Sequence, residues 1–110
     1  MKPIELHADN FQATLAKPGI VLVDWWATWC GPCRAFAPIF EKAAAVHTDV
    51  TFGKVDTDSE QALAGQFGIQ SIPTLMIFRD GDPVDQVEGF YGPRPFKAWL
   101  EKGANLNVTV

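Results

Sequence analysis

Two cysteines separated by two residues are the part of the chain with the clearest capacity for chemistry. Cys30 and Cys33 enclose Gly31 and Pro32, and the 110 residues contain no other cysteine. In a first helical turn, residues three positions apart have Cα atoms about 5 Å from each other, a distance that suits an unstrained disulfide. The pair can therefore alternate between a dithiol and a disulfide, which is the chemistry of thiol–disulfide exchange.

The residues before the pair predict where it lies. Residues 20–27 form an apolar run rich in β-forming side chains, and Asp24 is its only charged residue. The run is too short for a core helix and does not alternate, as expected of a central parallel strand buried on both faces. A helical pattern follows, so the cysteines occupy a strand-to-helix junction, where unpaired backbone N–H groups favour nearby negative charge.

This position predicts different roles for the two sulfur atoms. A free cysteine with a pKa of about 8.5 is roughly 3% ionised at pH 7, and only the thiolate attacks a disulfide. We expect Cys30 to be unusually acidic, to lie at the exposed end and to attack, while Cys33 lies one turn inside and resolves the mixed disulfide. Gly31 lets a substrate backbone approach, and Pro32 stiffens the turn.

Two other interpretations of the pair compete with redox chemistry. The cysteines could be half of a Cys₄ zinc site, although the sequence has no second pair and His7 and His47 lack metal-ligand spacing. They could also be an inert buried pair. We expect no metal site in this chain.

Periodicity predicts the elements that position the cysteines. A helix after the pair carries a one-sided set of residues at three- and four-residue steps, and Pro38 inside it predicts a kink in the helix's first half. That set is Cys33, Phe36, Phe40, Ala44 and His47. Strands are predicted at 51–55, 74–78 and 84–88, a helix at 59–67, a short helix after Asp9 or Asn10, and a last helix whose inner face holds Phe96, Trp99 and Leu100. The order is β-α-β-α-β-β-α with a weak extra element at 4–6, an α/β fold with two βαβ connections.

Composition narrows the class of protein. The length predicts a single domain over residues 1–110. Nine basic against thirteen acidic residues give a net charge of −4, and without a cluster of Lys and Arg we expect no nucleic-acid partner. The most apolar run is far shorter than a membrane span, so no membrane partner is expected. The first ten residues do not resemble a secretory signal, which predicts a cytoplasmic location.

The chain resembles the thioredoxin family over nearly its whole length. The resemblance lies in residues 23–33, which end in Trp29-Cys30-Gly31-Pro32-Cys33, and in the later Ile72-Pro73-Thr74. It implies a thioredoxin fold: a central mixed β-sheet of four to five strands flanked by helices on both faces. It also implies a protein disulfide reductase that acts on disulfide-containing proteins and is recharged by a flavin-containing, NADPH-dependent thioredoxin reductase. The chain itself would hold no cofactor and would act as a monomer.

The resemblance assigns roles to two charged residues. Asp24 matches a buried acidic residue that helps deprotonate the resolving cysteine, here Cys33. Its place in an apolar run supports burial, which would raise its pKa. Lys54 matches a lysine close to that carboxylate. From the residues alone, Asp24 on a solvated strand face and Lys54 as an ordinary exposed lysine remain open.

The resemblance also predicts a docking surface for substrates. Ile72 and Pro73 match a cis-proline loop that faces the cysteines and offers backbone groups to an extended segment. Trp29, Pro32, Ile72 and Gly89 would form an apolar rim around Cys30, although Trp29 could instead be a core residue. Phe90-Tyr91 is bulkier than the usual turn of the family and predicts altered partner choice near Gly89.

Two alternative functions use the same residues. A disulfide isomerase or oxidant would run the same chemistry at a higher potential. A binding module would use the surface of Trp29, Ile72 and Gly89 to stabilise a partner without redox turnover.

Overall fold

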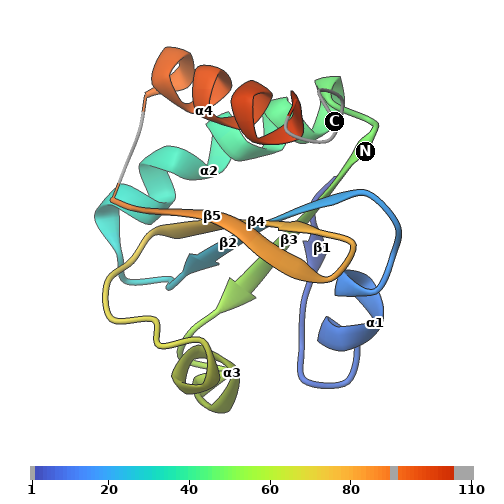
Figure 1. Cartoon of the computed structure of the whole chain (residues 1–110). Helices are drawn as coiled ribbons and strands as arrows, with labels where there is room; N and C mark the ends of the chain where they lie inside the picture. The colour runs from blue at the N-terminus through green and yellow to red at the C-terminus, as the bar shows by residue number, and fades with distance from the viewer. Residues whose placement is uncertain (1, 90–91, 106–110) are drawn as a thin grey trace.

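The computed structural model describes residues 2–89 and 92–105, which fold into one five-stranded sheet with helices on both of its faces (Figure 1). In chain order the elements are β1 (Ile4–Glu5), α1 (Phe11–Leu15), β2 (Ile20–Trp26), α2 (Gly31–Val46), β3 (Val50–Asp56), α3 (Gln61–Gln66), β4 (Thr74–Arg79), β5 (Asp82–Glu88) and α4 (Pro93–Asn105). The predicted α/β class is confirmed, and the weak element near residue 4 is a short edge strand.

The sheet is mixed, with strand order β1-β3-β2-β4-β5, so β2 lies at its centre as predicted. β2 pairs with β3 in parallel and with β4 antiparallel. Two βαβ units are present, β1-α1-β2 and β2-α2-β3. The second predicted unit, from β3 through α3 to β4, is wrong. Trp25 pairs with Val55, near the end of β3, and with Thr74, at the start of β4, so the connection begins and ends at the same edge of the sheet and β4 runs antiparallel.

The antiparallel direction of β4 places the loop before it at the same edge of the sheet as the cysteines. Trp25, near the end of β2, pairs with Thr74, at the start of β4. The loop that precedes β4 therefore meets the loop that follows β2, and Pro73 comes to the same edge of the sheet as the cysteines.

The alternation of side chains along β2 divides the core into two layers. Ile20 and Leu22 pack on the face covered by α2 and α4, together with Phe36, Phe40 and Phe96. The opposite layer lies under α1 and α3 and contains Val21, Val23, Trp25, Phe11 and Leu63. Figure 1 shows the two pairs of helices on opposite sides of the sheet. Because β2 is buried on both faces, its run of apolar residues does not alternate with polar ones.

Helix α2 begins directly after Cys30 and buries the face that the sequence predicted. Cys33, Phe36, Phe40 and Ala44 are buried, and His47 is the half-buried residue that ends the helix. Pro38 lies inside the helix on its exposed side. The kink at Pro38 stays a prediction.

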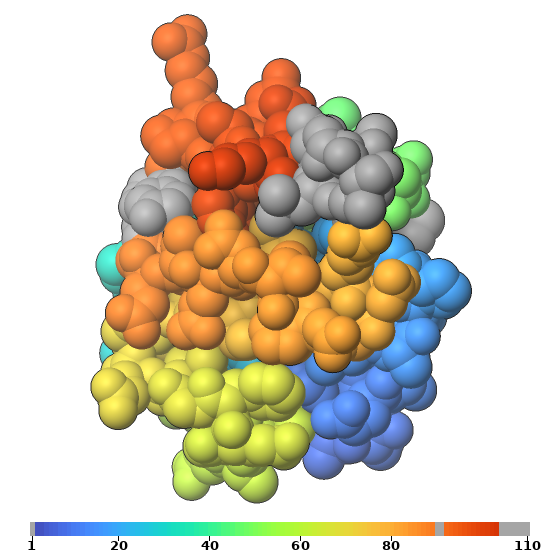
Figure 2. All heavy atoms as spheres, in the orientation of Figure 1, coloured from blue at the N-terminus to red at the C-terminus, as the bar shows by residue number. Residues whose placement is uncertain are grey.

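Several boundaries differ from the predicted ones. β5 starts at Asp82 rather than at residue 84, and Figure 2 shows this edge strand on the face turned to the viewer. α3 starts at Gln61 rather than at residue 59, because the Asp56 carboxylate accepts hydrogen bonds from the N–H groups of Asp58 (2.9 Å) and Ser59 (3.4 Å). This local turn competes with the helix for the same backbone groups.

The last helix buries Phe96 and Leu100 and half-buries Trp99, as predicted. Among residues 2–89 and 92–105, none of the helices combines the length and the apolar character that crossing a bilayer would require.

Candidate active site

Cys30 and Cys33 are joined by a disulfide at the N-terminus of α2, with their Cα atoms 5.2 Å apart. Cys30 is the N-cap residue, and its Sγ accepts a hydrogen bond of 3.2 Å from the backbone N–H of Cys33. An otherwise unpaired N–H of the first helical turn thus points at this sulfur. The same N–H, and the positive end of the helix dipole, would stabilise a thiolate at Cys30 after reduction.

Both cysteines are buried, with exposed fractions of 4% for Cys30 and 2% for Cys33. The expectation that Cys30 lies at an exposed end is therefore wrong for the oxidised chain. Its sulfur packs in a small apolar cluster with Ala27, Cys33, Trp26 and Ile72. The residues that reach solvent around it are Trp29, Gly31 and Pro32.

The loop before β4 covers Cys30 from the other side. The Ile72–Pro73 peptide bond is cis, as the sequence resemblance predicted. The carbonyl oxygen of Ile72 lies 3.9 Å from Cys30 Sγ. A disulfide sulfur has no proton to donate, so this is a packing contact in the oxidised chain, and it places a hydrogen-bond acceptor beside the thiol of the reduced one.

Gly89 lies against the same loop. Its N–H donates a hydrogen bond of 2.8 Å to the carbonyl oxygen of Pro73, and its φ of 102° is a conformation that favours glycine. The structure thus brings Ile72, Pro73 and Gly89 together at the edge that holds Cys30. Phe90 and Tyr91 lie outside the described residues.

Trp29 is 66% exposed, which rules out the interpretation that it belongs to the core. Its indole Nε1 donates a hydrogen bond of 2.8 Å to Oδ2 of Asp58. The loops that carry the two residues are tied together by the N–H of Thr57, which donates to the carbonyl oxygen of Trp26 (2.8 Å).

The sequence did not single out Asp58 as a site residue. The signal that could have found it is the pairing of β2 with β3. These two strands are adjacent and parallel, and Trp26 pairs with Asp56. Residues that follow the carboxyl ends of adjacent parallel strands meet at one edge of the sheet, which places Asp58 beside Trp29.

Asp24 is 1% exposed and lies on the α2 face of β2, because its side chain alternates in phase with Leu22. A solvated position is therefore excluded. Within the described part of the chain, its Oδ1 has no hydrogen-bond partner. Burial raises the pKa of Asp24 from 3.8 to about 7, and the positive charge of Lys54 opposes this rise.

Lys54 is the cross-strand partner of Asp24 on β3. Its Nζ lies 4.5 Å from the centroid of the Trp26 ring, in a cation–π arrangement, and the residue is half-buried. It is therefore not an ordinary exposed lysine. The structure brings Asp24, Lys54 and Trp26 together, and Trp26 packs against the apolar cluster that contains both cysteines.

Zinc binding was one of the alternatives that the sequence left open for the two cysteines. Across residues 2–89 and 92–105, no three His, Cys, Asp or Glu side chains are grouped so that they could hold a metal ion. Both cysteines, the residues on which a zinc site would depend, are joined to each other instead.

The fold and the buried cysteine pair define a class, the thiol–disulfide oxidoreductases built on a thioredoxin fold. The sequence model of the family described as Thioredoxin matches residues 2–102. The chain belongs to the thioredoxin family, whose members are protein disulfide oxidoreductases, and its Cys30–Cys33 pair is able to form the disulfide that this chemistry needs.

Individual relatives agree with this assignment. A putative thioredoxin 2 of Streptomyces coelicolor is 53% identical over 77 residues, which cover 70% of this chain and 58% of that protein. A thioredoxin of Alicyclobacillus acidocaldarius is 46% identical over 92 residues, 83% of this chain and 88% of that protein. The chain thus spans less than two thirds of the first relative and most of the second. A solved mutant thioredoxin from Halobacterium salinarum superposes with a TM-score of 0.85 at 33% identity, covering 94% of this chain and 91% of that one.

Proposed function

We propose that this chain reduces disulfides in other proteins, with Cys30 as the attacking residue and Cys33 as the resolving one. The observation that carries the proposal is the Cys30–Cys33 disulfide at the N-terminus of α2, within 3.9 Å of the Ile72 carbonyl in the cis-proline loop. A helix N-terminus favours the thiolate, and the adjacent loop offers backbone groups to an extended substrate segment.

The reaction is a sequence of two exchanges. The Cys30 thiolate attacks one sulfur of a substrate disulfide, so that a mixed disulfide forms and the second substrate sulfur leaves as a thiolate that takes up a proton. Cys33, once deprotonated, attacks Cys30 Sγ. The mixed disulfide breaks, the Cys30–Cys33 disulfide forms, and the first substrate sulfur leaves. Two electrons pass from the cysteine pair to the substrate.

Asp24 is the group that we assign to proton transfer from Cys33. A carboxyl with a pKa near 7 is partly ionised at neutral pH, so it can accept a proton and later return it. Its location on the α2 face of β2 supports this role. Lys54 is assigned as a positioning residue, because its charge keeps the pKa of Asp24 from rising further.

Substrate docking is assigned to the surface around the cysteines. Trp29, Gly31 and Pro32 are exposed, and Ile72 is half-buried beside them. Gly89 holds the Pro73 carbonyl through its N–H. We expect the apolar side chains to contact the substrate and the backbone of residues 72–73 to pair with it.

The oxidised chain must be recharged before another turnover. We extend the proposal to a flavin-containing, NADPH-dependent thioredoxin reductase as the electron donor, with no cofactor held by this chain. A monomer in the cytoplasm fits this role, because the reducing conditions of that compartment return the Cys30–Cys33 disulfide to the dithiol.

Single cysteine variants test the assignment. Cys33→Ser should accumulate covalent complexes with disulfide-containing proteins, since the mixed disulfide can no longer be resolved, whereas Cys30→Ser should trap almost none. Non-reducing electrophoresis with mass spectrometry measures both. If both variants bind partners as wild type does and trap nothing, the chain is a binding module and the proposal is wrong.

The direction of electron flow needs a separate measurement. The equilibrium of the Cys30–Cys33 pair against glutathione gives its reduction potential. A value near −270 mV, of the order found for thioredoxin-type pairs, supports the reductase, whereas a value near −120 to −180 mV would identify an oxidant or isomerase.

A further inference from the structure

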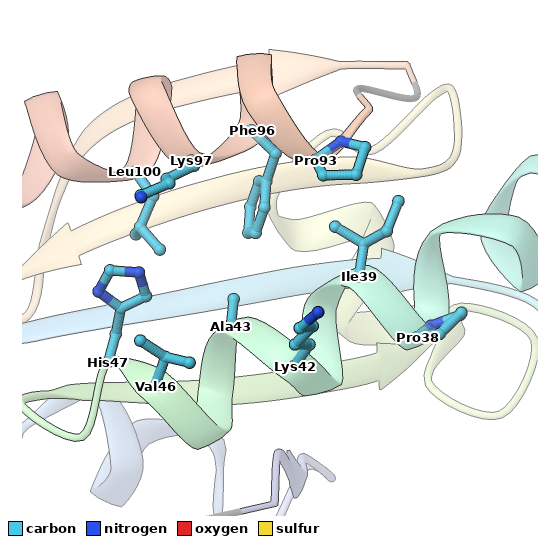
Figure 3. Close-up of a pocket in the computed structure, with 10 residues that line it drawn as sticks. All are labelled: Pro38, Ile39, Lys42, Ala43, Val46, His47, Pro93, Phe96, Lys97 and Leu100. Carbon is cyan, nitrogen blue, oxygen red and sulfur yellow. The ribbon is translucent and has the colours of Figure 1, made fainter.

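A groove lies between α2 and α4 (Figure 3). Its volume is about 470 Å³, and its walls come from residues 38–46 of α2, the C-cap residue His47, and residues 93–100 of α4. The groove's lining residue nearest to the cysteines along α2 is Pro38, five residues or about 7.5 Å beyond Cys33, and none of the lining residues belongs to the candidate active site. The groove is therefore separate from the site described above, and the proposed reductase reaction does not use it.

The floor of the groove is apolar. It is lined by Ile39, Ala43, Phe96 and Leu100, and Val46 lies at its solvent-exposed edge. Val46 is 68% exposed, one of the few large apolar side chains left open to solvent in the described part of the chain. The volume lies within the range of about 300–1,000 Å³ that is typical of small-molecule sites.

The rim of the groove is basic in a chain whose net charge is −4. Lys42 reaches it from α2 and Lys97 from α4, while His47 lies near the end of α2, and none of its lining residues is acidic. Within the described part of the chain, neither lysine takes part in a hydrogen bond or a salt bridge. Two ammonium groups thus flank an apolar floor.

One end of the groove is lined by apolar side chains alone, whereas the other end and the middle hold both basic and apolar side chains. In Figure 3, Lys97 and His47 lie toward one end with Leu100, Lys42 lies near the middle, and Pro38, Ile39 and Pro93 lie at the other end. A ligand that matches this division has an anionic head and an unbranched apolar tail.

We propose that the groove binds a straight-chain aliphatic carboxylate, with its head between Lys42 and Lys97 and its tail directed toward Pro38 and Pro93. Burial of the tail on the apolar floor supplies affinity, and the paired lysines select the anion over a neutral molecule of the same length.

A titration with sodium octanoate tests this site directly. In amide NMR spectra of the oxidised chain, octanoate should cause saturable shifts in residues of α2 and α4 that line the groove. The neutral analogue 1-octanol should bind the same residues more weakly, because it lacks the charge. Shifts that do not saturate or that lie elsewhere, or equal binding of the two compounds, would overturn the proposal.

Charge reversal distinguishes a direct effect of the two groove lysines on octanoate from an effect of the chain's net charge. The double variant Lys42→Glu/Lys97→Glu should weaken octanoate binding about tenfold and leave octanol binding within about twofold. The matched control Lys17→Glu/Lys102→Glu changes the net charge equally at residues that do not line the groove, and it should bind octanoate like wild type. Equal binding by both double variants would remove the lysines from the site.

A substitution at the apolar edge of the groove tests the contribution of its apolar lining. Val46→Asp places a charge in the groove at a side chain that is already exposed, so the fold should be retained while octanoate and octanol binding are both lost. Exchange with a small-molecule disulfide should be unchanged in this variant, which confirms an intact Cys30 site. If an acidic amphipathic peptide shifts the groove residues and octanoate does not, the groove is a protein-docking site and the proposal is wrong.

Discussion

The indole Nε1 of Trp29 donates a hydrogen bond of 2.8 Å to Oδ2 of Asp58 and so joins the loop after β2 to the loop after β3. The bond restrains a tryptophan that is 66% exposed and adjacent in sequence to Cys30. An exposed tryptophan without a partner would sample several rotamers, and ordering it again would cost free energy when a substrate binds.

Asp58→Ala should therefore weaken reduction of protein substrates. A hydrogen bond of this kind contributes about 0.5–1.5 kcal/mol, so kcat/KM should fall roughly threefold to tenfold. The Trp29 indole N–H resonance should move toward the position of a solvated indole. Asp49→Ala, at another exposed aspartate, is the control. An unchanged indole resonance would show that the bond does not order Trp29 in solution.

Asp24→Asn should stabilise the oxidised chain in a pH-dependent way. The folded-state pKa of Asp24 is raised from 3.8 to about 7, so the folded chain disfavours the ionised form. The stability that wild type gains from a protonated Asp24 is fully present below pH 3.8 and is lost as the pH rises through about 7. Above that pH, the difference in free energy of unfolding between wild type and Asp24→Asn is constant. The raised pKa corresponds to up to about 4 kcal/mol.

Urea unfolding of wild type and Asp24→Asn between pH 4 and pH 8 measures this effect. The variant should gain stability relative to wild type across that range, with the two nearly equal at the acidic end. Asp49→Asn, at an exposed aspartate, should follow wild type throughout. A stability difference that is independent of pH would contradict the assigned pKa.

Lys54→Met should raise the pKa of Asp24 further. The charge of Lys54 lowers that pKa, against the larger effect of burial. Without it the carboxyl should titrate above its present value of about 7, as followed by the ¹³C NMR signal of Asp24. Lys17→Met, at a lysine on the surface, should leave the titration in place. A lowered pKa in Lys54→Met would show that the lysine does not act through its charge.

Local patterns predicted most of the fold. The buried strand at residues 20–27, the one-sided helix after the cysteines and the inner face of the last helix are all present, because each depends on periodicity within one segment. The direction of β4 could not be read in this way. It depends on the edge of the sheet at which the segment between β3 and β4 ends, and no periodicity within one segment records that edge.

In the candidate site too, features set by one segment were predictable from the sequence and contacts between distant segments were not. The spacing of Cys30 and Cys33 was sufficient to predict their disulfide, and the lone charge in an apolar run was sufficient to predict a buried Asp24. Contacts between distant loops were not predictable from spacing. Ile72 packs on Cys30, and Trp29 donates a hydrogen bond to Asp58; in both cases the two residues are more than 25 positions apart. The contact with Ile72 helps to bury the Cys30 sulfur, which was expected to be exposed.

Gly89 and Gly65 should respond in opposite ways to the same substitution. Gly89 has a φ of 102°, which an L-residue adopts only at a cost, while nothing lies within 4 Å of the position of an added Cβ at either glycine. Gly89→Ala should therefore destabilise the chain by about 1–3 kcal/mol through its backbone alone. Gly65 lies in α3, where alanine favours the helix, so Gly65→Ala should stabilise the chain by about 0.5–1 kcal/mol. Urea unfolding measures both, and because the N–H of Gly89 holds the Pro73 carbonyl, only Gly89→Ala should also slow protein disulfide reduction. Equal stability changes in the two variants would mean that Gly89 does not keep this conformation in solution.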